Sequence, residues 1–131
     1  TSILITLTAR HLAPDLPIST VVRATDNEVL ARQAGATTVI NPASFAGLLL
    51  AGSCQGSHLA DYIADLAATG GRVKLRERAV AATEIGQPLH AVTPGLAVRI
   101  YRSGKPVGYW EAGAKALQAG DTIIEIVPGD Q

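Results

Sequence analysis

The sequence has 131 residues, of which 47% are hydrophobic, and its formal net charge is zero. This length suggests one domain or two small lobes, with enough apolar residues to build a core. The balanced charge does not indicate a surface for nucleic acid or anionic lipid, and no apolar run approaches the roughly 18 residues of a membrane span.

The first elements follow the order of the second half of a dinucleotide-binding fold. We expect a helix over residues 2–12, because the apolar stretch is long and Pro14 follows it. Residues 18–24, ISTVVRA, are rich in β-branched side chains, as in a buried strand. The next helix should end at Gly35, before a second short strand over residues 36–40. Two strands joined by so short a helix should be parallel.

A candidate ligand site lies where the first strand meets the following helix. Thr25 and Glu28 have the spacing of a capping box. Open α/β sheets bind ligands at this edge, where the free helix amides and Arg23 could hold an anion. The predicted ligand-binding residues are Arg23, Asp26 and Glu28. In the alternative interpretation, Thr25 and Glu28 only cap the helix and Arg23 points into solvent.

Two apolar helices are expected next. The first covers residues 43–52, with Asn41 as its N-cap and Pro42 at the first helical position, and the second covers residues 58–69, capped by Ser57. One face of the second helix is apolar at helical spacing. That face consists of Leu59, Tyr62, Ile63 and Leu66. It would pack either on the helix's own sheet or, as a dimer interface, on a partner subunit.

The pattern changes at Gly70-Gly71, where we place a boundary between lobes 1–70 and 71–131. The second lobe should be a small α+β unit with a short helix between Glu84 and Val92 and a hairpin turn at Ser103-Gly104. Its expected strands cover residues 72–80, 96–102, 105–110 and 121–127. A lobe of this size is marginally stable alone, so we expect it to pack against a partner.

The basic run RVKLRER, residues 72–78, has two interpretations. Val73 and Leu75 alternate with basic residues, so we expect the basic side chains to form the solvated face of a half-buried strand. The alternative is a surface for an acidic partner or a nucleotide phosphate. For Trp110, at the end of the hairpin, we expect a place in the core.

The sequence contains none of the common catalytic motifs, so we assign no catalytic residue and expect a protein that is not an enzyme. The three histidines are widely spaced and form no ligand pattern with Cys54, so we predict no metal site. These histidines are His11, His58 and His90. As the only cysteine, Cys54 cannot form an internal disulfide.

Several motifs in this order resemble one family. They are LTARHLAPDLPI, VVRATD, QAGATTVINP, RVKLRERAV, AVRIYRSGKPV and LQAGDTIIEIV. Together they make the sequence similar to the second half of the Rossmann-like lobe, and the C-terminal lobe, of an RCK (regulator of K⁺ conductance) domain. This family includes Trk-type potassium-uptake regulators and the cytoplasmic domains of prokaryotic potassium channels.

The resemblance implies an α/β fold, in which a partial Rossmann-like parallel sheet with flanking helices precedes a small α+β lobe. It implies a cytoplasmic, ligand-sensing and assembly domain of a potassium channel or potassium-uptake transporter, at the inner face of the membrane. The expected partners are further copies of the chain, as a dimer or a ring paired through the helices after the sheet, and a channel pore or transporter membrane subunit. Nucleic acid is not expected.

The sequence also departs from the family. The first strands, with their glycine-rich loop and ribose-binding acid, have no counterpart, so we expect a piece of a longer protein. This chain should hold no cofactor alone; a nucleotide or divalent cation would belong to the longer parent. Arg23 and Thr25 stand where some calcium-gated members carry carboxylates. Two alternatives remain: the rear fragment of an NAD-dependent dehydrogenase, and a purely structural oligomerisation module.

Overall fold

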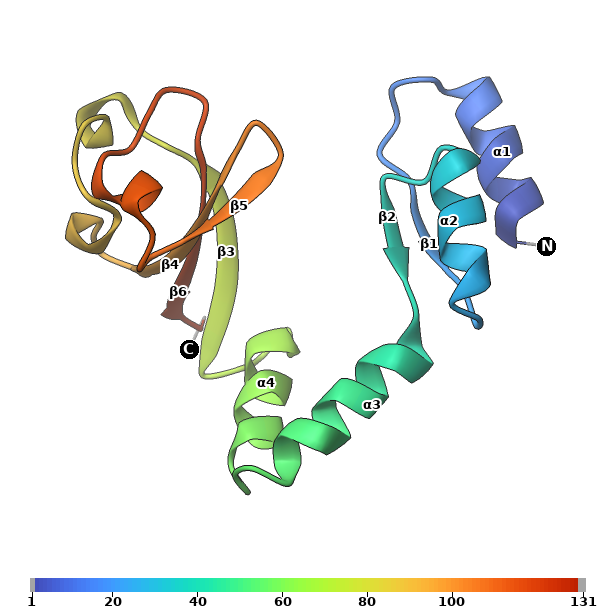
Figure 1. The fold of residues 1–131 in the computed structure, drawn as a ribbon, viewed down its shortest axis with the longest axis horizontal. Coiled ribbons are helices and arrows are strands. Elements are labelled where there is room, and N and C mark those ends of the chain that lie inside the picture. The colour runs from blue at the N-terminus through green and yellow to red at the C-terminus, as the bar shows by residue number, and fades with distance from the viewer. Residues whose placement is uncertain (1, 130–131) are drawn as a thin grey trace. The chain divides into compact units, whose positions relative to one another are not determined.

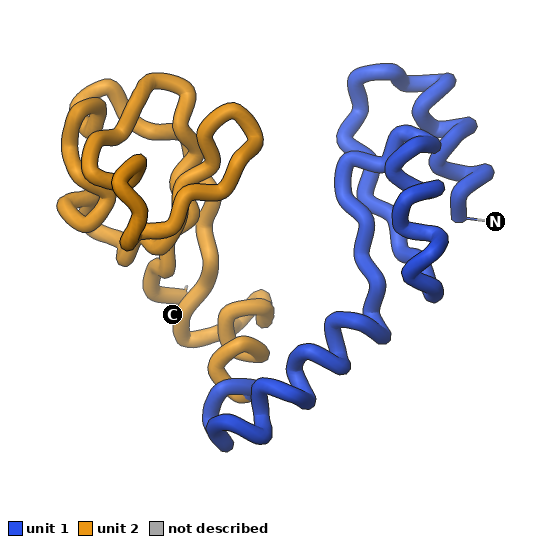
Figure 2. Tube along the Cα trace, in the orientation of Figure 1, with its two compact units in different colours: residues 1–60 blue, residues 61–131 orange. Residues whose placement is uncertain are grey.

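The computed structural model of the protein describes residues 2–129, which fall into two compact units (Figure 2). The first unit comprises residues 1–60 and the second residues 61–131. The division therefore falls inside a helix, before the boundary that the sequence predicted at Gly70-Gly71. Among the described residues, no helix combines the length and the apolar character that crossing a membrane requires.

The first unit contains three helices and two short strands (Figure 1). Its elements are α1 (Ser2–Leu12), β1 (Ser19–Val21), α2 (Asp26–Gln33), β2 (Thr38–Ile40) and α3 (Pro42–Ser53). Helix α4 (Leu59–Ala67) spans the division between the units. The helices expected over residues 2–12 and 43–52 are confirmed, and so is Asn41 as the cap of α3, since its side chain accepts from the amide of Ser44.

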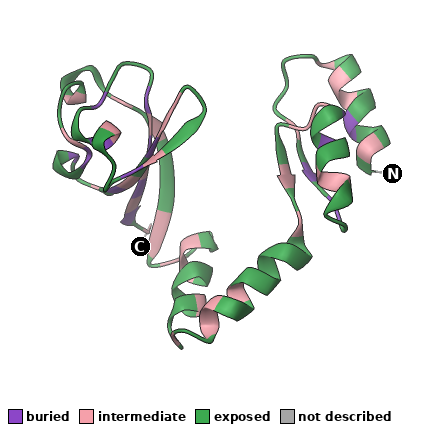
Figure 3. Cartoon of the chain, viewed as in Figure 1, coloured by how far each residue is buried: buried purple, intermediate pink, exposed green. Residues whose placement is uncertain are grey.

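Strands β1 and β2 are parallel, as predicted, with Thr20 opposite Val39. Helices α1 and α2 lie on the same side of this pair (Figure 1). The buried residues of the unit are small: Thr6, Thr20, Val22, Ala31 and Ala34. Such a core is thin, and α3 has no buried residue at all (Figure 3).

Arg10 ties α1 to the end of α2. Its Nε and Nη2 donate to the carbonyl of Gly35, at 3.1 and 2.7 Å. Gly35 has φ +101°, and a Cβ there would lie 2.7 Å from Cγ of Arg10. The expected glycine stop of α2 is thus confirmed, and the missing side chain also leaves room for the arginine.

The second unit is a four-stranded antiparallel sheet with strand order β3-β6-β4-β5 and short 3₁₀ turns. Its elements are β3 (Val73–Ala79), η1 (Ala82–Glu84), η2 (Leu89–Ala91), β4 (Leu96–Arg102), β5 (Lys105–Gly108), η3 (Ala112–Lys115) and β6 (Thr122–Pro128). The predicted hairpin is confirmed: Ser103 and Gly104 join β4 to β5, both with positive φ, as a two-residue hairpin turn requires. The α/β fold class predicted from the sequence is confirmed.

The single short helix expected between Glu84 and Val92 is replaced by η1 and η2. Between them, Gly86 has φ +84° and Pro88 is extended, with ψ 148°. Neither conformation continues a helix, so the segment breaks into two turns.

The core of the second unit covers only one face of its sheet. It consists of Leu89, Val92, Ala97, Ile100, Ala114, Leu117 and Ile123. Strand β4 has a β-bulge between Ala97 and Arg99. Val98 is the extra residue there and has no partner in β6. Because the bulge shifts the alternation by one residue, Ala97 and Ile100 both face the core while Arg99 faces outward.

Candidate functional site

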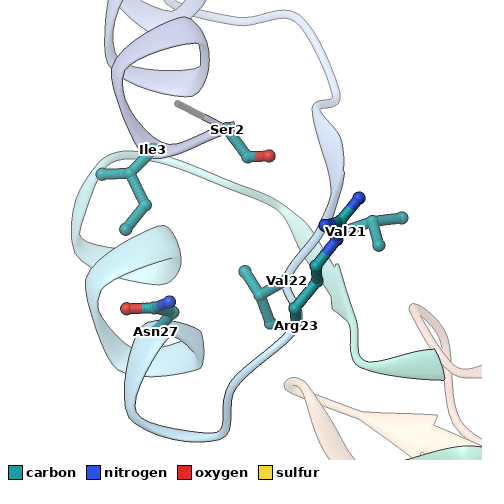
Figure 4. Close-up of a pocket in the computed structure, with 6 residues that line it drawn as sticks. All are labelled: Ser2, Ile3, Val21, Val22, Arg23 and Asn27. Atoms are coloured by element: carbon teal, nitrogen blue, oxygen red, sulfur yellow. The ribbon is translucent and has the colours of Figure 1, made fainter. Parts of the chain in front are cut away.

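Arg23 follows β1 and lines a pocket of about 540 Å³ (Figure 4). The other lining residues are Ser2, Ile3, Val21, Val22 and Asn27, from the start of α1, the end of β1 and the first turn of α2. Its side chain is exposed, so the guanidinium is accessible to an anion. This geometry matches the sheet edge that the sequence singled out, and ligand binding by Arg23 stays a prediction.

The capping box predicted at Thr25 is wrong. Thr25 has helical backbone angles, φ −58° and ψ −38°, and its side chain makes no capping hydrogen bond. The first amides are satisfied by backbone carbonyls instead: Asn27 donates to Ala24, and Glu28 donates to Thr25, both at 3.0 Å. A cap residue normally has an extended backbone, which turns its oxygen toward these amides.

Glu28 contacts a different part of the unit. Its Oε1 accepts from Nδ2 of Asn41 at 3.1 Å, which links α2 to the start of α3. It lines a second pocket, of about 440 Å³, with Val39, Ile40, Asn41, Ser44, Phe45 and Leu48. Asp26 begins α2 and is exposed. The structure therefore places Arg23 and Glu28 in separate pockets.

The apolar stripe predicted on the helix after Ser57 lies on α4. Leu59, Tyr62 and Ile63 are 47%, 48% and 38% exposed, and Leu66 is half-buried. Phe45, Leu48 and Leu50 of α3 are exposed as well. Removing such surface from water is favourable at roughly 25 cal/mol per Å², so each of these helices, taken by itself, presents an apolar side suited to a partner.

Sequence reasoning missed a buried carboxylate in the second unit. Glu125 of β6 is fully buried, and its Oε1 accepts from Nε of Arg76 at 2.7 Å and from Nε of Arg78 at 2.9 Å. A carboxylate can be buried in this way only when it is paired. Its Oε2 has no hydrogen-bond partner among the described residues. This oxygen lies beside Gly95, where a Cβ would be only 2.6 Å away.

This carboxylate corrects the interpretation of the basic run. Arg76 and Arg78 lie on the core side of β3, opposite Glu125 and Ile123 of β6, while Leu75 on the other side is 52% exposed. The prediction is therefore wrong about which face of β3 turns away from the core, because Glu125 holds both arginines on the core side. The side chain of Arg76 is nevertheless 45% exposed, as the prediction of solvated basic residues expected. The core position expected for Trp110 is also wrong: the ring is 69% exposed and contacts Tyr109 edge-on.

Two further carboxylates are held by arginine. Arg78 donates two hydrogen bonds to Glu84, at 2.7 and 2.8 Å, and with the amide of Ala81 it lowers the pKa of Glu84 to about 2. Arg102 likewise lowers the pKa of Asp121 below its usual value. Both carboxylates thus stay ionised at neutral pH, as structural ion-pair partners.

Among residues 2–129, no group of three or more His, Cys, Asp and Glu side chains could hold a metal ion. Arg23 and its neighbours are the candidate site for an anionic group. The exposed apolar sides of α3 and of α4, each taken by itself, are candidate surfaces for a partner.

No family model matches the sequence, and no curated protein matches it. Solved structures do. They are the crystal structure of the GsuK RCK domain, a structure of the GsuK channel bound to NAD, and a structure of the GsuK channel.

Each of the three structures aligns with 97% of this chain, at 19% identity and a TM-score of 0.43. The chain spans 28% of the length of the GsuK RCK-domain chain and 23% of that of the two channel chains.

Proposed function

We propose that this chain is part of a cytoplasmic regulatory domain that assembles with further copies of itself and controls a potassium channel or a potassium-uptake transporter. The observation that carries the proposal is the apolar side of α4. Tyr62 and Ile63 are exposed in a helix that follows a parallel β-α-β unit. In the family that the sequence resembles, the helices at this place pair between subunits.

Control of a membrane protein by such a domain requires two assembled states that a ligand distinguishes. The pocket beside Arg23 supports an anionic group as that ligand. The partner of the regulatory domain would be the pore or membrane subunit of the transport system, at the inner face of the membrane. In this role the chain senses and assembles, and it catalyses no reaction.

The test is potassium uptake in cells that carry Tyr62→Asp in the longer parent protein. We expect the variant to lose regulated uptake, measured with rubidium as a tracer, while the protein level stays normal. Asp61→Asn, on the same helix and exposed, is the control and should leave uptake unchanged. Normal regulation in a Tyr62→Asp strain with altered oligomeric mass would contradict the proposal.

The enzymatic alternative has a separate test. The rear fragment of a dehydrogenase would contribute to NADH oxidation by the parent protein, whereas a regulatory domain would not. Absorbance at the NADH band, followed with the purified parent and a panel of small carbonyl substrates, distinguishes the two. Steady NADH consumption that depends on this segment would replace the proposed function with a catalytic one.

A further inference from the structure

The sheet of the second unit has one face that its described residues leave largely uncovered, apart from the Trp110 ring over Gly108 at one edge. This outer face is mainly apolar, and its exposed members include Leu75 (52%), Leu96 (66%) and Trp110 (69%). A soluble protein seldom leaves so much contiguous apolar surface without a partner. The residues that line it are Leu75, Glu77, Val98, Arg99, Tyr101, Tyr109, Trp110 and Ile124.

The strand register orders this face into rows. In the central row, Ile124 of β6 is opposite Glu77 of β3 on one side and opposite Arg99 of β4 on the other. In the row above, Ile126 is likewise flanked by Leu75 and Leu96. In the row below, Thr122 is flanked by Ala79 and Tyr101. Each row thus has a β6 residue at its centre.

Glu77 and Arg99 carry opposite charges at the two ends of the central row. They lie two strands apart, which is roughly 10 Å at the usual strand spacing. Both are exposed, and the structure shows no ion pair for either within residues 2–129. Each charge is thus available to a partner placed on the face.

A second copy of the same face complements this pattern. Two such sheets can face each other across a two-fold axis that runs parallel to β6 and lies between them. Strand β3 of one copy then lies over β4 of the other, and β6 lies over β6. Glu77 then meets Arg99 of the second copy, Leu75 meets Leu96, and the small Ala79 meets the large Tyr101. Ile124 and Ile126 meet their own counterparts on the axis. Such self-complementarity is the requirement for an isologous dimer, and sheets pack face to face in this aligned manner.

We propose that the outer face of the β3-β6-β4 sheet is a dimer interface between two copies of this chain, with reciprocal Glu77–Arg99 ion pairs on either side of Ile124. The bulge at Val98 is essential to it, because the bulge turns Arg99 outward. This inference rests on the proposed assembly role and adds to it a surface separate from α4. Trp110, beyond β4 at the edge of the face, would lie against β3 of the second copy.

The test is a charge exchange in the full chain, followed by light scattering. Glu77→Arg alone, or Arg99→Glu alone, sets like charges against each other and should weaken association at least tenfold. The double variant Glu77→Arg/Arg99→Glu restores opposite pairs and should regain most of the association. Lys105→Glu, an exposed change on β5, is the control and should leave association unaltered.

Trp110 gives a second readout, since it is the only tryptophan. On association its emission should shift to shorter wavelength with rising protein concentration, and Glu77→Arg should abolish the shift. A monomeric wild type, single variants with unchanged mass, or a double variant that fails to recover would each overturn the inference. If Tyr62→Asp lowers the oligomeric mass and the charge variants do not, the result supports the α4 contact of the proposed function and rejects the sheet interface.

Discussion

Arg102 holds Asp121 through both carboxylate oxygens. Nε donates to Oδ1 at 2.8 Å and Nη2 donates to Oδ2 at 2.7 Å. The Asp121 side chain is fully buried, and its Oδ2 also accepts from the amide of Gln118 at 2.8 Å. The pair therefore fixes the turn that leads into β6 against the end of β4.

Removing the arginine should destabilise the second unit strongly. Arg102→Met leaves a buried carboxylate without its cation, and loss of one partner from such a pair costs about 3 kcal/mol or more. Urea unfolding, followed by far-ultraviolet circular dichroism, measures this loss. Lys105 is exposed and lies across the hairpin turn from Arg102. The free energy of unfolding of Lys105→Met should stay within about 0.5 kcal/mol of the wild type. Equal stability of the two variants would show that the pair contributes little.

The low pKa of Glu84 predicts acid sensitivity. A carboxyl whose pKa is about 2 when folded, and roughly 4.3 when unfolded, stabilises the fold fully above the unfolded value. That stabilisation is lost as the pH falls from about 5 toward 2. Glu84→Gln should therefore reduce the free energy of unfolding at neutral pH and flatten its decline in acid. Unfolding titrations between pH 7 and 2 measure the slope, with Asp61→Asn, at an exposed carboxylate, as the control; equal slopes would argue against the Arg78 contact.

Gly35 and Gly52 should respond in opposite directions to alanine. Gly35→Ala forces a side chain into the left-handed region and against Arg10, at a cost of about 1–2 kcal/mol. Gly52 lies within α3, where a Cβ would meet nothing within 4 Å, so Gly52→Ala should stabilise the helix by up to about 1 kcal/mol. Thermal unfolding of both variants tests the pair. A stabilised Gly35→Ala variant would rule out the close approach of Arg10.

A charge on the α4 stripe should weaken assembly, because it would have to be buried in an apolar contact. Tyr62→Asp is the sharper variant, since Tyr62 is 48% exposed and Leu66 is half-buried. Leu66→Asp should weaken assembly too, with some loss of fold. Analytical ultracentrifugation should show a lower mass for both and an unchanged mass for Asp61→Asn. A folded Tyr62→Asp protein of wild-type mass would remove α4 from the interface.

Arg23 should matter for anionic ligands of the longer protein. Calorimetry with ATP and with NAD should show little binding to the chain alone, because its sequence holds no glycine-rich loop. In the longer parent, Arg23→Gln should weaken nucleotide binding about tenfold, the value of one charge-assisted hydrogen bond. Arg32→Gln, on the exposed side of α2, should not. Equal affinity in both variants would leave the pocket beside Arg23 without a role in binding.

Local signals predicted the elements well. The apolar runs, the cap at Asn41 and the turn at Ser103-Gly104 all depend on residues close in sequence. The side of β3 that faces the core depends instead on Glu125, which is distant in sequence but directly opposite Arg76. Alternation alone marks two faces of a strand without indicating which one is buried. The apolar face is usually the buried one, but here the carboxylate paired with two arginines places the basic face toward the core.

The candidate site shows the same limit. The position of Arg23 at the end of a strand followed from the order of elements, and the structure puts it beside a pocket. The partner of Glu28 did not follow, because Asn41 approaches it only when β2 runs parallel to β1. The outward turn of Arg99 required the bulge at Val98, for which the sequence carries no distinct signal.

The tight space between Gly95 and Glu125 has a consequence for comparing related sequences. Because any side chain at position 95 would collide with Oε2 of Glu125, the two positions should vary together. Homologues that keep the glutamate should keep the glycine, and those with a smaller residue at 125 should tolerate alanine or serine at 95. The two positions, thirty places apart in the chain, would then serve as one paired marker of this sheet.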